Sequence, residues 1–265
     1  MVKNSWLGKN SWVKKNWVSR KTAIAGLLAV CIALFSCSKV PVQAETKIDP
    51  QFEQQVLEVL RKHPEVILES VRKYQQDQAK QAQQAQQALL DQLKTNPKAA
   101  IGSSPTLGAP LGKVVLFEFS DFQCPYCAGV IPTLKEFVKK YPDKVTLVYK
   151  HFPLSSIHLE AVNAAKAAWA AQQQGKFWEY HDALFAQQKS LNSATYSAIA
   201  TSLKLDLAKF ERDRTSAAAA AAVAKDQALG DQLGIDGTPF FIMNGQAFSG
   251  GVPLAELEKR MNQGQ

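Results

Sequence analysis

The stretch that decides the fold covers residues 114–127 and reads VVLFEFSDFQCPYC. Its first six residues form a mainly apolar run typical of a buried β-strand, and Cys124-Pro125-Tyr126-Cys127 follows where a helix should begin. A helix N-terminus stabilises negative charge, and the thiolate is the reactive form of cysteine. Cys127 lies one helical turn after Cys124, close enough to form a disulfide with it. The stretch therefore predicts a dithiol–disulfide site that exchanges with the disulfides of other proteins.

The cysteine count favours redox chemistry over a metal site. The chain has four cysteines, and Cys31 and Cys37 lie in an apolar N-terminal segment. The four histidines show none of the close spacings of a zinc finger, so the Cys124–Cys127 pair lacks a second half-site. We therefore predict a redox-active Cys124–Cys127 disulfide, no metal and no other cofactor.

The net charge of +8 is concentrated at the N-terminus. Residues 1–44 contain seven basic residues and no acid, and the remaining chain has 24 basic residues against 23 acidic ones. The basic excess therefore belongs to a targeting segment and does not indicate a nucleic-acid partner, which would need a basic face on the folded domain.

Residues 1–44 have the pattern of an export signal. A basic region precedes the uncharged apolar run at residues 23–36, and Val42-Gln43-Ala44 provides small residues for cleavage before Glu45. Two alternatives remain open: a retained membrane anchor, and lipidation of Cys37 within a sequence that resembles a lipobox. All three place the rest of the chain in the periplasm or an equivalent lumen, where disulfides persist.

Residues 45–98 are predicted to be helical without a core of their own. Apolar side chains recur at spacings of three and four between Phe52 and Tyr74, which marks one helix face. His63-Pro64 predicts a break between two helices. The segment is either a solvated linker or a stalk that forms a homo-oligomer by burying this face against further copies, and the unpartnered stripe favours the stalk.

A globular domain is predicted over residues 99–265, entered through a Pro-, Gly- and Ser-rich hinge at residues 96–112. Asn244-Gly245 predicts a hairpin turn. Strands are predicted at residues 111–119, 144–151, 240–244 and 246–249. Helices are predicted at residues 125–141, over most of 155–230 and at 253–261. This order indicates an α+β fold with one central sheet.

Residues 107–261 resemble the DsbA-type thiol–disulfide oxidoreductases of the thioredoxin superfamily. The CPYC sequence matches the active-site motif, Glu118 the buried acid beneath it, and Pro132 the proline that kinks the active-site helix. Gly237-Thr238-Pro239 matches the segment whose proline is cis and faces the active-site disulfide. The resemblance implies a thioredoxin-like fold with a large helical insertion, here at about residues 153–232.

The N-terminal extension is similar to that of the ScsC-like branch, in which it oligomerises the protein. Two positions depart from the best-known DsbA pattern: Tyr126 stands where DsbA has His, and Thr238 where DsbA has Val. Both positions tune the thiol pKa and the reduction potential, so DsbA values do not transfer to this chain.

The supporting residues have alternative interpretations. Pro125 fits the first helical turn because it gives up an N–H that has no partner there. Tyr126 either tunes Cys124 or presents its ring to substrates. Glu118 is either a proton relay for the thiols or a satisfied core acid. A cis Pro239 would bring the Thr238 backbone beside the disulfide, where it can pair with an extended substrate.

These observations predict an exported protein disulfide oxidoreductase, with Cys124 as nucleophile and Cys127 as resolving thiol. Its substrates would be cysteine-containing exported proteins, and a membrane partner would re-oxidise or reduce the site. One alternative is an oligomeric isomerase or reductase kept reduced by that partner. A remote alternative is a binding module whose CxxC is structural, although closing so short a loop removes little unfolded-chain entropy.

Overall fold

The computed structural model describes residues 49–263, which divide into two units at Glu69 and Ser70. In the first unit, helix α2 (Pro50–Lys62) begins after Asp49, whose carboxylate accepts a hydrogen bond from the Gln51 N–H at 2.9 Å. Helix α2 ends at Lys62, His63 is its C-cap residue, and α3 (Pro64–Thr95) begins at Pro64. The predicted break at His63-Pro64 is therefore confirmed.

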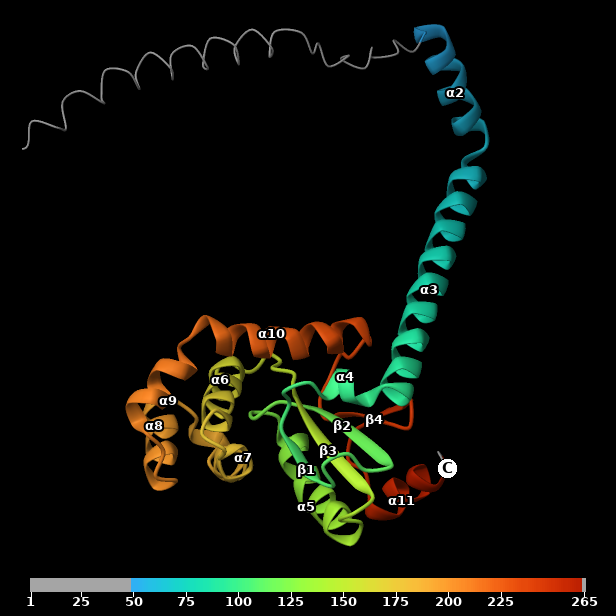
Figure 1. Cartoon of the computed structure of the whole chain (residues 1–265). Coiled ribbons are helices and arrows are strands. Elements are labelled where there is room, and N and C mark those ends of the chain that lie inside the picture. The colour runs from blue at the N-terminus through green and yellow to red at the C-terminus, as the bar shows by residue number, and fades with distance from the viewer. Residues whose placement is uncertain (1–48, 264–265) are drawn as a thin grey trace, which may run out of the picture. The chain divides into compact units, whose positions relative to one another are not determined.

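The second unit contains the end of α3 and an α+β domain. Its sheet has five strands in the order β1-β3-β2-β4-β5, with β2 and β3 parallel and the other pairs antiparallel. The strands are β1 (Thr106–Gly108), β2 (Val114–Ser120), β3 (Val145–His151), β4 (Phe240–Met243) and β5 (Gln246–Ser249). The helices after α3 are α4 (Pro97–Ile101), α5 (Pro125–Lys140), α6 (Ala161–Gln172), α7 (Phe177–Ala186), α8 (Ser193–Ser202), α9 (Leu207–Arg214), α10 (Ala217–Gln232) and α11 (Leu254–Gln263), with a 3-10 turn at Gln188–Ser190. The predicted fold class, a thioredoxin-like sheet with a large helical insertion, is confirmed (Figure 1).

Alternate residues of β2 point to opposite faces of the sheet. Leu116 packs with Leu134 and Phe137 of α5, whereas Phe117 packs with Leu90 and Leu93 of α3 on the other face. All seven β2 residues are buried, which explains why the sequence reads as a continuous apolar run instead of an alternating one.

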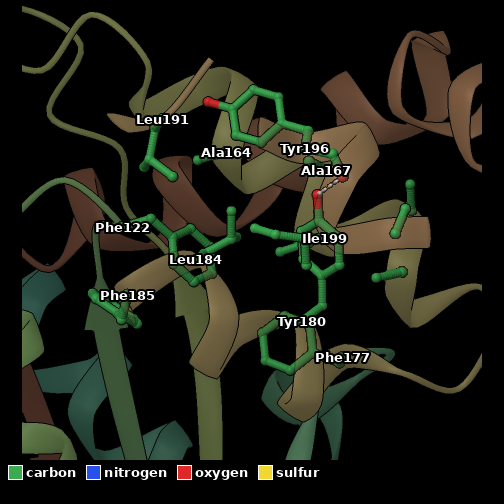
Figure 2. Close-up of a cluster of buried hydrophobic side chains, with 14 of the residues drawn as sticks. Phe122, Ala164, Ala167, Phe177, Tyr180, Leu184, Phe185, Leu191, Tyr196 and Ile199 are labelled. Atoms are coloured by element: carbon green, nitrogen blue, oxygen red, sulfur yellow. Dashed lines mark hydrogen bonds between the residues drawn. The ribbon is translucent and has the colours of Figure 1, made fainter. Parts of the chain in front are cut away.

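The helical insertion between β3 and β4 has its own core, drawn in Figure 2. Alanines on α6 allow close approach of the other helices, and the Tyr180 hydroxyl donates to the Tyr196 carbonyl at 3.0 Å inside this core. Both cysteines and Phe122 belong to the same cluster, so the insertion is packed directly behind the CPYC segment.

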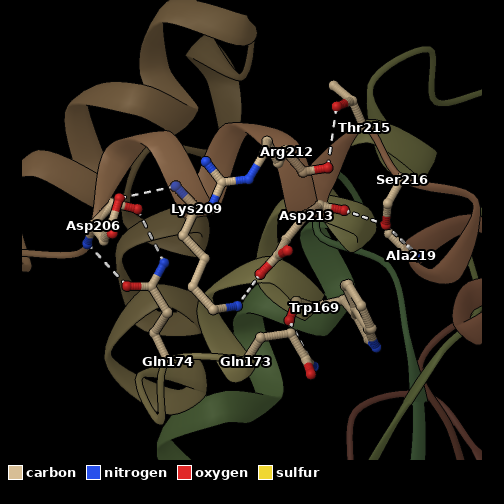
Figure 3. Close-up of polar contacts among 10 residues, drawn as sticks. All are labelled: Trp169, Gln173, Gln174, Asp206, Lys209, Arg212, Asp213, Thr215, Ser216 and Ala219. Atoms are coloured by element: carbon tan, nitrogen blue, oxygen red, sulfur yellow. Dashed lines mark hydrogen bonds and ion pairs between the residues drawn. The ribbon is translucent and has the colours of Figure 1, made fainter. Parts of the chain in front are cut away.

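Short polar residues fix where the insertion helices begin (Figure 3). Asp206 accepts a hydrogen bond from the Lys209 N–H at 2.9 Å at the start of α9, and Ser216 accepts one from the Ala219 N–H at 3.1 Å at the start of α10. Gln174 exchanges two hydrogen bonds with the Asp206 backbone, which ties α9 to the end of α6.

The expected hinge at residues 96–112 is wrong. This segment contains helix α4 and strand β1, which pairs with β3 at the edge of the sheet. The Lys150 ammonium group donates to the Ala100 carbonyl at 2.7 Å, the Ser104 hydroxyl at 2.7 Å and the Asp226 carboxylate at 3.0 Å. These long-range contacts hold in place a sequence whose composition resembles a loop.

The remaining predicted elements differ mainly at their boundaries. The strand expected at residues 111–119 begins at Val114, and the final helix begins at Leu254. The hairpin turn has positive φ at Asn244 (55°) and Gly245 (76°), the conformation that an Asn-Gly turn requires. Most of the Gln- and Ala-rich part of α3 is exposed, but Gln86 is half-buried and donates to the Leu233 carbonyl. Leu90 and Leu93 belong to the domain core and not to a linker.

Candidate active site

The catalytic motif lies where β2 gives way to α5. Cys124 is the N-cap residue of α5, with extended backbone geometry, and Pro125 is the first helical residue. The Cys124 N–H donates to the Asp121 carbonyl at 3.1 Å, and the Asp121 carboxylate accepts from the Gln123 N–H at 2.7 Å. The turn therefore directs the Cys124 side chain to the helix N-terminus, where a thiolate is stabilised.

The two cysteines are free thiols with opposite electrostatic environments. A hydrogen bond from the Cys127 thiol is the main cause that lowers the pKa of Cys124 to about 5, and backbone N–H groups of Cys127 and Tyr126 add to it against the cost of burial. Burial, followed by the hydrogen bond to Cys124, raises the pKa of Cys127 above its usual range. Cys124 is thus the thiolate and Cys127 the protonated partner at neutral pH.

The segment before β4 lies against the nucleophile. The Thr238–Pro239 peptide bond is cis, and the Cys124 thiol donates to the Thr238 carbonyl at 3.2 Å. The side chain of Thr238, as distinct from its carbonyl, also lowers the pKa of Cys124. The structure therefore brings Thr238 and Pro239, 114 residues from the cysteine, into the predicted site.

Tyr126 presents its side chain to solvent, with 71% of its surface exposed, whereas Cys124 is 3% and Cys127 0% exposed. Its backbone N–H lowers the pKa of Cys124, and its ring is exposed within the CPYC motif. The geometry thus separates the two roles considered for Tyr126: the backbone tunes the thiolate, and the ring is available to a substrate.

Glu118 is 1% exposed and lies on the β2 face that packs against α5. Desolvation raises the pKa of Glu118 to about 7, against a smaller opposing effect of the Ser120 hydroxyl. Its Oε1 atom has no hydrogen-bond partner in the structure. Both interpretations of Glu118, a proton relay for the thiols and a core acid, stay predictions.

Several residues that order the site were not identified from the sequence. The buried Asp121 carboxylate accepts hydrogen bonds from the Leu154 N–H and the His158 ring, each at 2.8 Å. Gln188 of the insertion donates to the Phe122 and Cys124 carbonyls at 2.8 and 2.9 Å. The Asp-Phe-Gln order before the cysteine signals a side-chain-capped turn, but nothing local points to Gln188.

The loop that follows β3 lies beside the cysteines and exposes apolar side chains. The Asp121 carboxylate holds its start, and the Gln123 side chain accepts from the Glu160 N–H at 2.6 Å at its end. Between these anchors Ile157 and Leu159 are exposed, Leu159 by 90%. Tyr126 of the CPYC motif is also exposed, so both segments present apolar side chains to solvent.

Among residues 49–263, no cluster of three His, Cys, Asp or Glu side chains has the arrangement to hold a metal ion. The chemistry of the site as described is that of its two sulfur atoms, a polarising backbone and a buried acid.

Comparison with known proteins identifies relatives of this domain. A family model described as Thioredoxin matches residues 100–263. A thioredoxin-like oxidoreductase from Silicibacter pomeroyi is 32% identical in sequence, with a TM-score of 0.55, and the match covers 61% of this chain and 92% of that one. The thiol-disulfide exchange protein alpha-DsbA2 from Wolbachia pipientis has a TM-score of 0.59 and covers 67% of this chain and 95% of its own, but at 21% identity it shows the fold alone.

Curated relatives are longer proteins that this chain matches over part of their length. A Na(+)/H(+) antiporter NhaA 3 from Salinispora tropica is 39% identical over 144 residues, which cover 54% of this chain and 22% of that protein. The chain thus spans about a fifth of the length of this relative. The similarity carries no ion-transport function to this chain.

Proposed function

The chain belongs to the thioredoxin family, and on that premise we propose that it is a DsbA-type thiol–disulfide oxidoreductase that forms or rearranges disulfide bonds in other exported proteins. The observation that carries the proposal is the opposite shift of two neighbouring thiol pKa values: that of Cys124 falls to about 5, and that of Cys127 rises. A structural CxxC needs no such asymmetry, which argues against a binding module with a disulfide staple.

The exchange reaction follows from this asymmetry. In the oxidising direction a substrate thiolate attacks Cys124 Sγ of the enzyme disulfide, a Cys124–substrate disulfide forms, and Cys127 leaves as a thiolate that takes up a proton. A second substrate thiolate then attacks the mixed disulfide and releases Cys124, whose low pKa makes it a good leaving group. The substrate loses two electrons and the enzyme gains them. The reducing direction reverses these steps.

The surroundings of Cys124 suit a polypeptide substrate. The Thr238 carbonyl lies 3.2 Å from the nucleophile, and strand addition at such a segment gives sequence-independent affinity. Tyr126, Ile157 and Leu159 offer apolar contacts of the kind an unfolded chain can use. We therefore infer that the substrates are unfolded or partly folded proteins with accessible cysteines.

Loss of the nucleophile tests this function. The full chain should accelerate oxidative refolding of a reduced disulfide protein, or its reduction by a dithiol, and Cys124→Ser should abolish the acceleration. Cys127→Ser is the matched control, because it keeps the attacking thiolate and should accumulate mixed disulfides that a non-reducing gel detects. Full activity in Cys124→Ser would exclude the proposed function.

The direction of the reaction depends on a redox partner, which we propose to be a membrane protein. If the Cys124 thiolate stabilises the dithiol form strongly, the chain is an oxidant, and its partner must re-oxidise it. Equilibration with glutathione buffers measures this preference. A disulfide form that persists in reducing buffer favours the isomerase or reductase alternative, with a partner that supplies electrons.

Export is proposed from residues 1–44, which lie outside the described residues. None of the helices within residues 49–263 has the length and apolar character needed to cross a bilayer. N-terminal sequencing of the exported protein should begin at Glu45. A blocked Cys37 would indicate lipidation, and an intact N-terminus in the membrane fraction would indicate an anchor.

A second candidate, an oligomeric isomerase, is favoured by one observation. Apolar side chains of the predicted stripe, among them Phe52, Val59, Ile67 and Tyr74, are exposed in the single chain. Burying them against further copies would stabilise an oligomer by about 25 cal/mol per Å² of apolar surface. Several active sites could then act on one substrate and raise the effective concentration of thiols.

Substitutions on the exposed face of α2 test this candidate without disturbing the domain. Val56→Lys with Val59→Lys should convert an oligomer to monomers by light scattering and reduce reshuffling of scrambled disulfides. Gln55→Lys on the same helix is the control for added charge. A monomeric unmodified chain at tens of micromolar would exclude this candidate. A truncation at residue 99 is unsuitable because it would remove Leu90 and Leu93 from the core.

A further inference from the structure

Gln188 lies at the junction between the helical insertion and the turn that carries the nucleophile. It is the first residue of the 3-10 turn that comes after α7, and it is half-buried. Its side-chain amide nitrogen donates to the Phe122 carbonyl at 2.8 Å and to the Cys124 carbonyl at 2.9 Å. One side chain of the insertion therefore contacts the backbone of the nucleophile directly.

Both donors of the Gln188 amide group are used in this contact. A side-chain amide nitrogen carries two hydrogens, and two backbone carbonyls accept from it here. These carbonyls belong to residues on either side of Gln123 in the chain. Because the amide group is planar, it fixes the two carbonyl oxygens relative to each other, which a single hydrogen bond would not do.

The Cys124 carbonyl is held only weakly by the helix itself. Cys124 is the N-cap residue of α5, and its carbonyl accepts the first hydrogen bond of the helix from the Ala128 N–H at 3.3 Å. That distance is longer than the usual value of about 3 Å. The Phe122 carbonyl precedes the helix, and Gln188 supplies its donor. Gln188 therefore completes the hydrogen bonding of the turn before α5.

The insertion holds the same turn by a second contact. The Phe122 ring is 1% exposed and packs against the Phe185 ring of α7, with centroids 5.0 Å apart (Figure 2). The His181 ring of the same helix meets the Phe122 ring edge-on, with centroids 5.7 Å apart. The end of α7 thus packs against the side chain of residue 122, while the 3-10 turn binds its carbonyl.

The stability of the Cys124 thiolate depends on where its sulfur lies. The hydrogen bond from the Cys127 thiol is the largest cause that lowers the pKa of Cys124, and Thr238 and the backbone N–H groups of Cys127 and Tyr126 add to it against the cost of burial. The effect of a helix N-terminus falls off within its first turn. A small rotation of the Cys124 backbone would therefore move the sulfur away from these donors and raise its pKa.

We propose that Gln188 is a positioning residue of the exchange reaction: its amide group holds the Phe122 and Cys124 carbonyls and so keeps the nucleophile at the N-terminus of α5. This inference rests on the proposed function, because it concerns the reactivity of the Cys124 thiolate. It assigns to the helical insertion a direct part in that reactivity, exerted through one side chain.

This positioning also affects the redox equilibrium. Two molecules of reduced glutathione give two electrons to the Cys124–Cys127 disulfide, which forms oxidised glutathione and the dithiol, and one proton is released because Cys124 stays ionised. A more stable thiolate favours the dithiol form and makes the disulfide form more oxidising. Loss of the Gln188 amide should therefore shift this equilibrium toward the disulfide form of the chain.

Gln188→Met tests the proposal, because methionine has a similar length and volume but no hydrogen to donate. On the full chain, mass spectrometry follows alkylation at Cys124. Its midpoint should rise from about pH 5 by about one unit, a tenfold change in the ionisation constant. The glutathione equilibrium should shift toward the disulfide by up to the same factor. Gln187→Met, at the exposed neighbouring position, should leave both values unchanged.

A second control separates positioning from stability. Tyr180→Phe removes the hydrogen bond to the Tyr196 carbonyl in the core of the insertion, dashed in Figure 2. It should lower the free energy of unfolding but leave the Cys124 midpoint unchanged. An equal rise of the midpoint in Tyr180→Phe would attribute the shift to lost stability and overturn the proposal. If Gln188→Met lowers the stability and leaves the midpoint unchanged, the contact is only structural and the proposal is wrong.

The unsubstituted chain provides a test that remains valid if Gln188→Met does not fold. The NMR signals of the Gln188 side-chain amide should shift with pH around the Cys124 midpoint, because the amide is bonded to the carbonyl of the ionising residue. This shift should vanish in Cys124→Ser. Signals that do not respond to pH, or that respond equally in Cys124→Ser, overturn the proposal. A chain that forms no mixed disulfide between Cys124 and glutathione contradicts the proposed function instead.

Discussion

The two faces of the central sheet differ in how completely their buried polar groups are hydrogen-bonded. On the face toward α10, all three Lys150 ammonium donors are used, and both Asp226 carboxylate oxygens accept hydrogen bonds. On the face toward α5, Glu118, Ser120 and Tyr149 each keep an unpaired polar atom. The satisfied network fixes the strand edge and α4 in place, whereas the unsatisfied one lies under the reacting thiols. Complete hydrogen bonding thus distinguishes the structural Lys150–Asp226 network from the polar cluster at the candidate active site.

The largest expected effect comes from breaking the satisfied network. Asp226→Ala leaves the Lys150 ammonium buried without its counter-charge, which costs about 3–5 kcal/mol. We expect the free energy of unfolding in urea to fall by that amount, while the folded fraction keeps its thiol–disulfide exchange activity. Lys225→Ala, at the exposed neighbouring position, should change stability by no more than about 0.5 kcal/mol. A loss in Asp226→Ala below about 1 kcal/mol would mean that the pair acts like a surface ion pair.

A smaller change in the free energy of unfolding is expected from Glu118 in the unsatisfied cluster, and removal of this charge should stabilise the protein at high pH. The pKa of Glu118 rises from 4.5 to about 7 on folding, so the folded state binds this proton more tightly than the unfolded state. Stability of the reduced protein should therefore fall as pH rises from about 4.5 to about 7, by up to about 3 kcal/mol, and level off above that.

Removing the ionisable group should remove this loss. Glu118→Gln should match the unsubstituted chain near pH 4 and exceed its free energy of unfolding at pH 8, while its exchange rate falls. Glu136→Gln, on the exposed face of α5, controls for the loss of one carboxylate. If Glu118→Gln shows the same decline in stability with pH as the unsubstituted chain, another group causes that decline.

The secondary structure could be predicted from the sequence only where it depends on local residues. Local signals predicted β2, β3, the hairpin and the break at His63-Pro64, because each depends on neighbouring residues. Strand β1 was missed: it has three residues in a Pro- and Gly-rich stretch, and it exists because β3 offers a pairing edge. Propensity cannot show such a tertiary contribution.

The candidate site divides in the same way. The CPYC motif and the Thr238-Pro239 segment were found through their spacing and the family resemblance, and the structure brings them together. Asp121 and Gln188 were missed as site residues because their roles depend on contacts with residues far along the chain. A sequence pattern reports which chemistry is present, whereas hydrogen-bond satisfaction of a buried group appears only once the strands are paired.

The smallest expected effect concerns the contact between the two thiols themselves. The Cys127 hydrogen bond is the largest cause of the low Cys124 pKa, so Cys127→Ala should move the midpoint of Cys124 alkylation upward from about pH 5 by at least about one unit, or about 1.4 kcal/mol. Cys127→Ser keeps a donor at that position and should show a smaller shift. Alkylation rates across the pH range measure both, since only the thiolate reacts. An unchanged midpoint in Cys127→Ala would mean that the α5 backbone and Thr238 stabilise the Cys124 thiolate, and not the Cys127 thiol. The low pKa of Cys124 would then depend on fixed hydrogen bonds, like those of the Lys150–Asp226 network, and not on the second thiol.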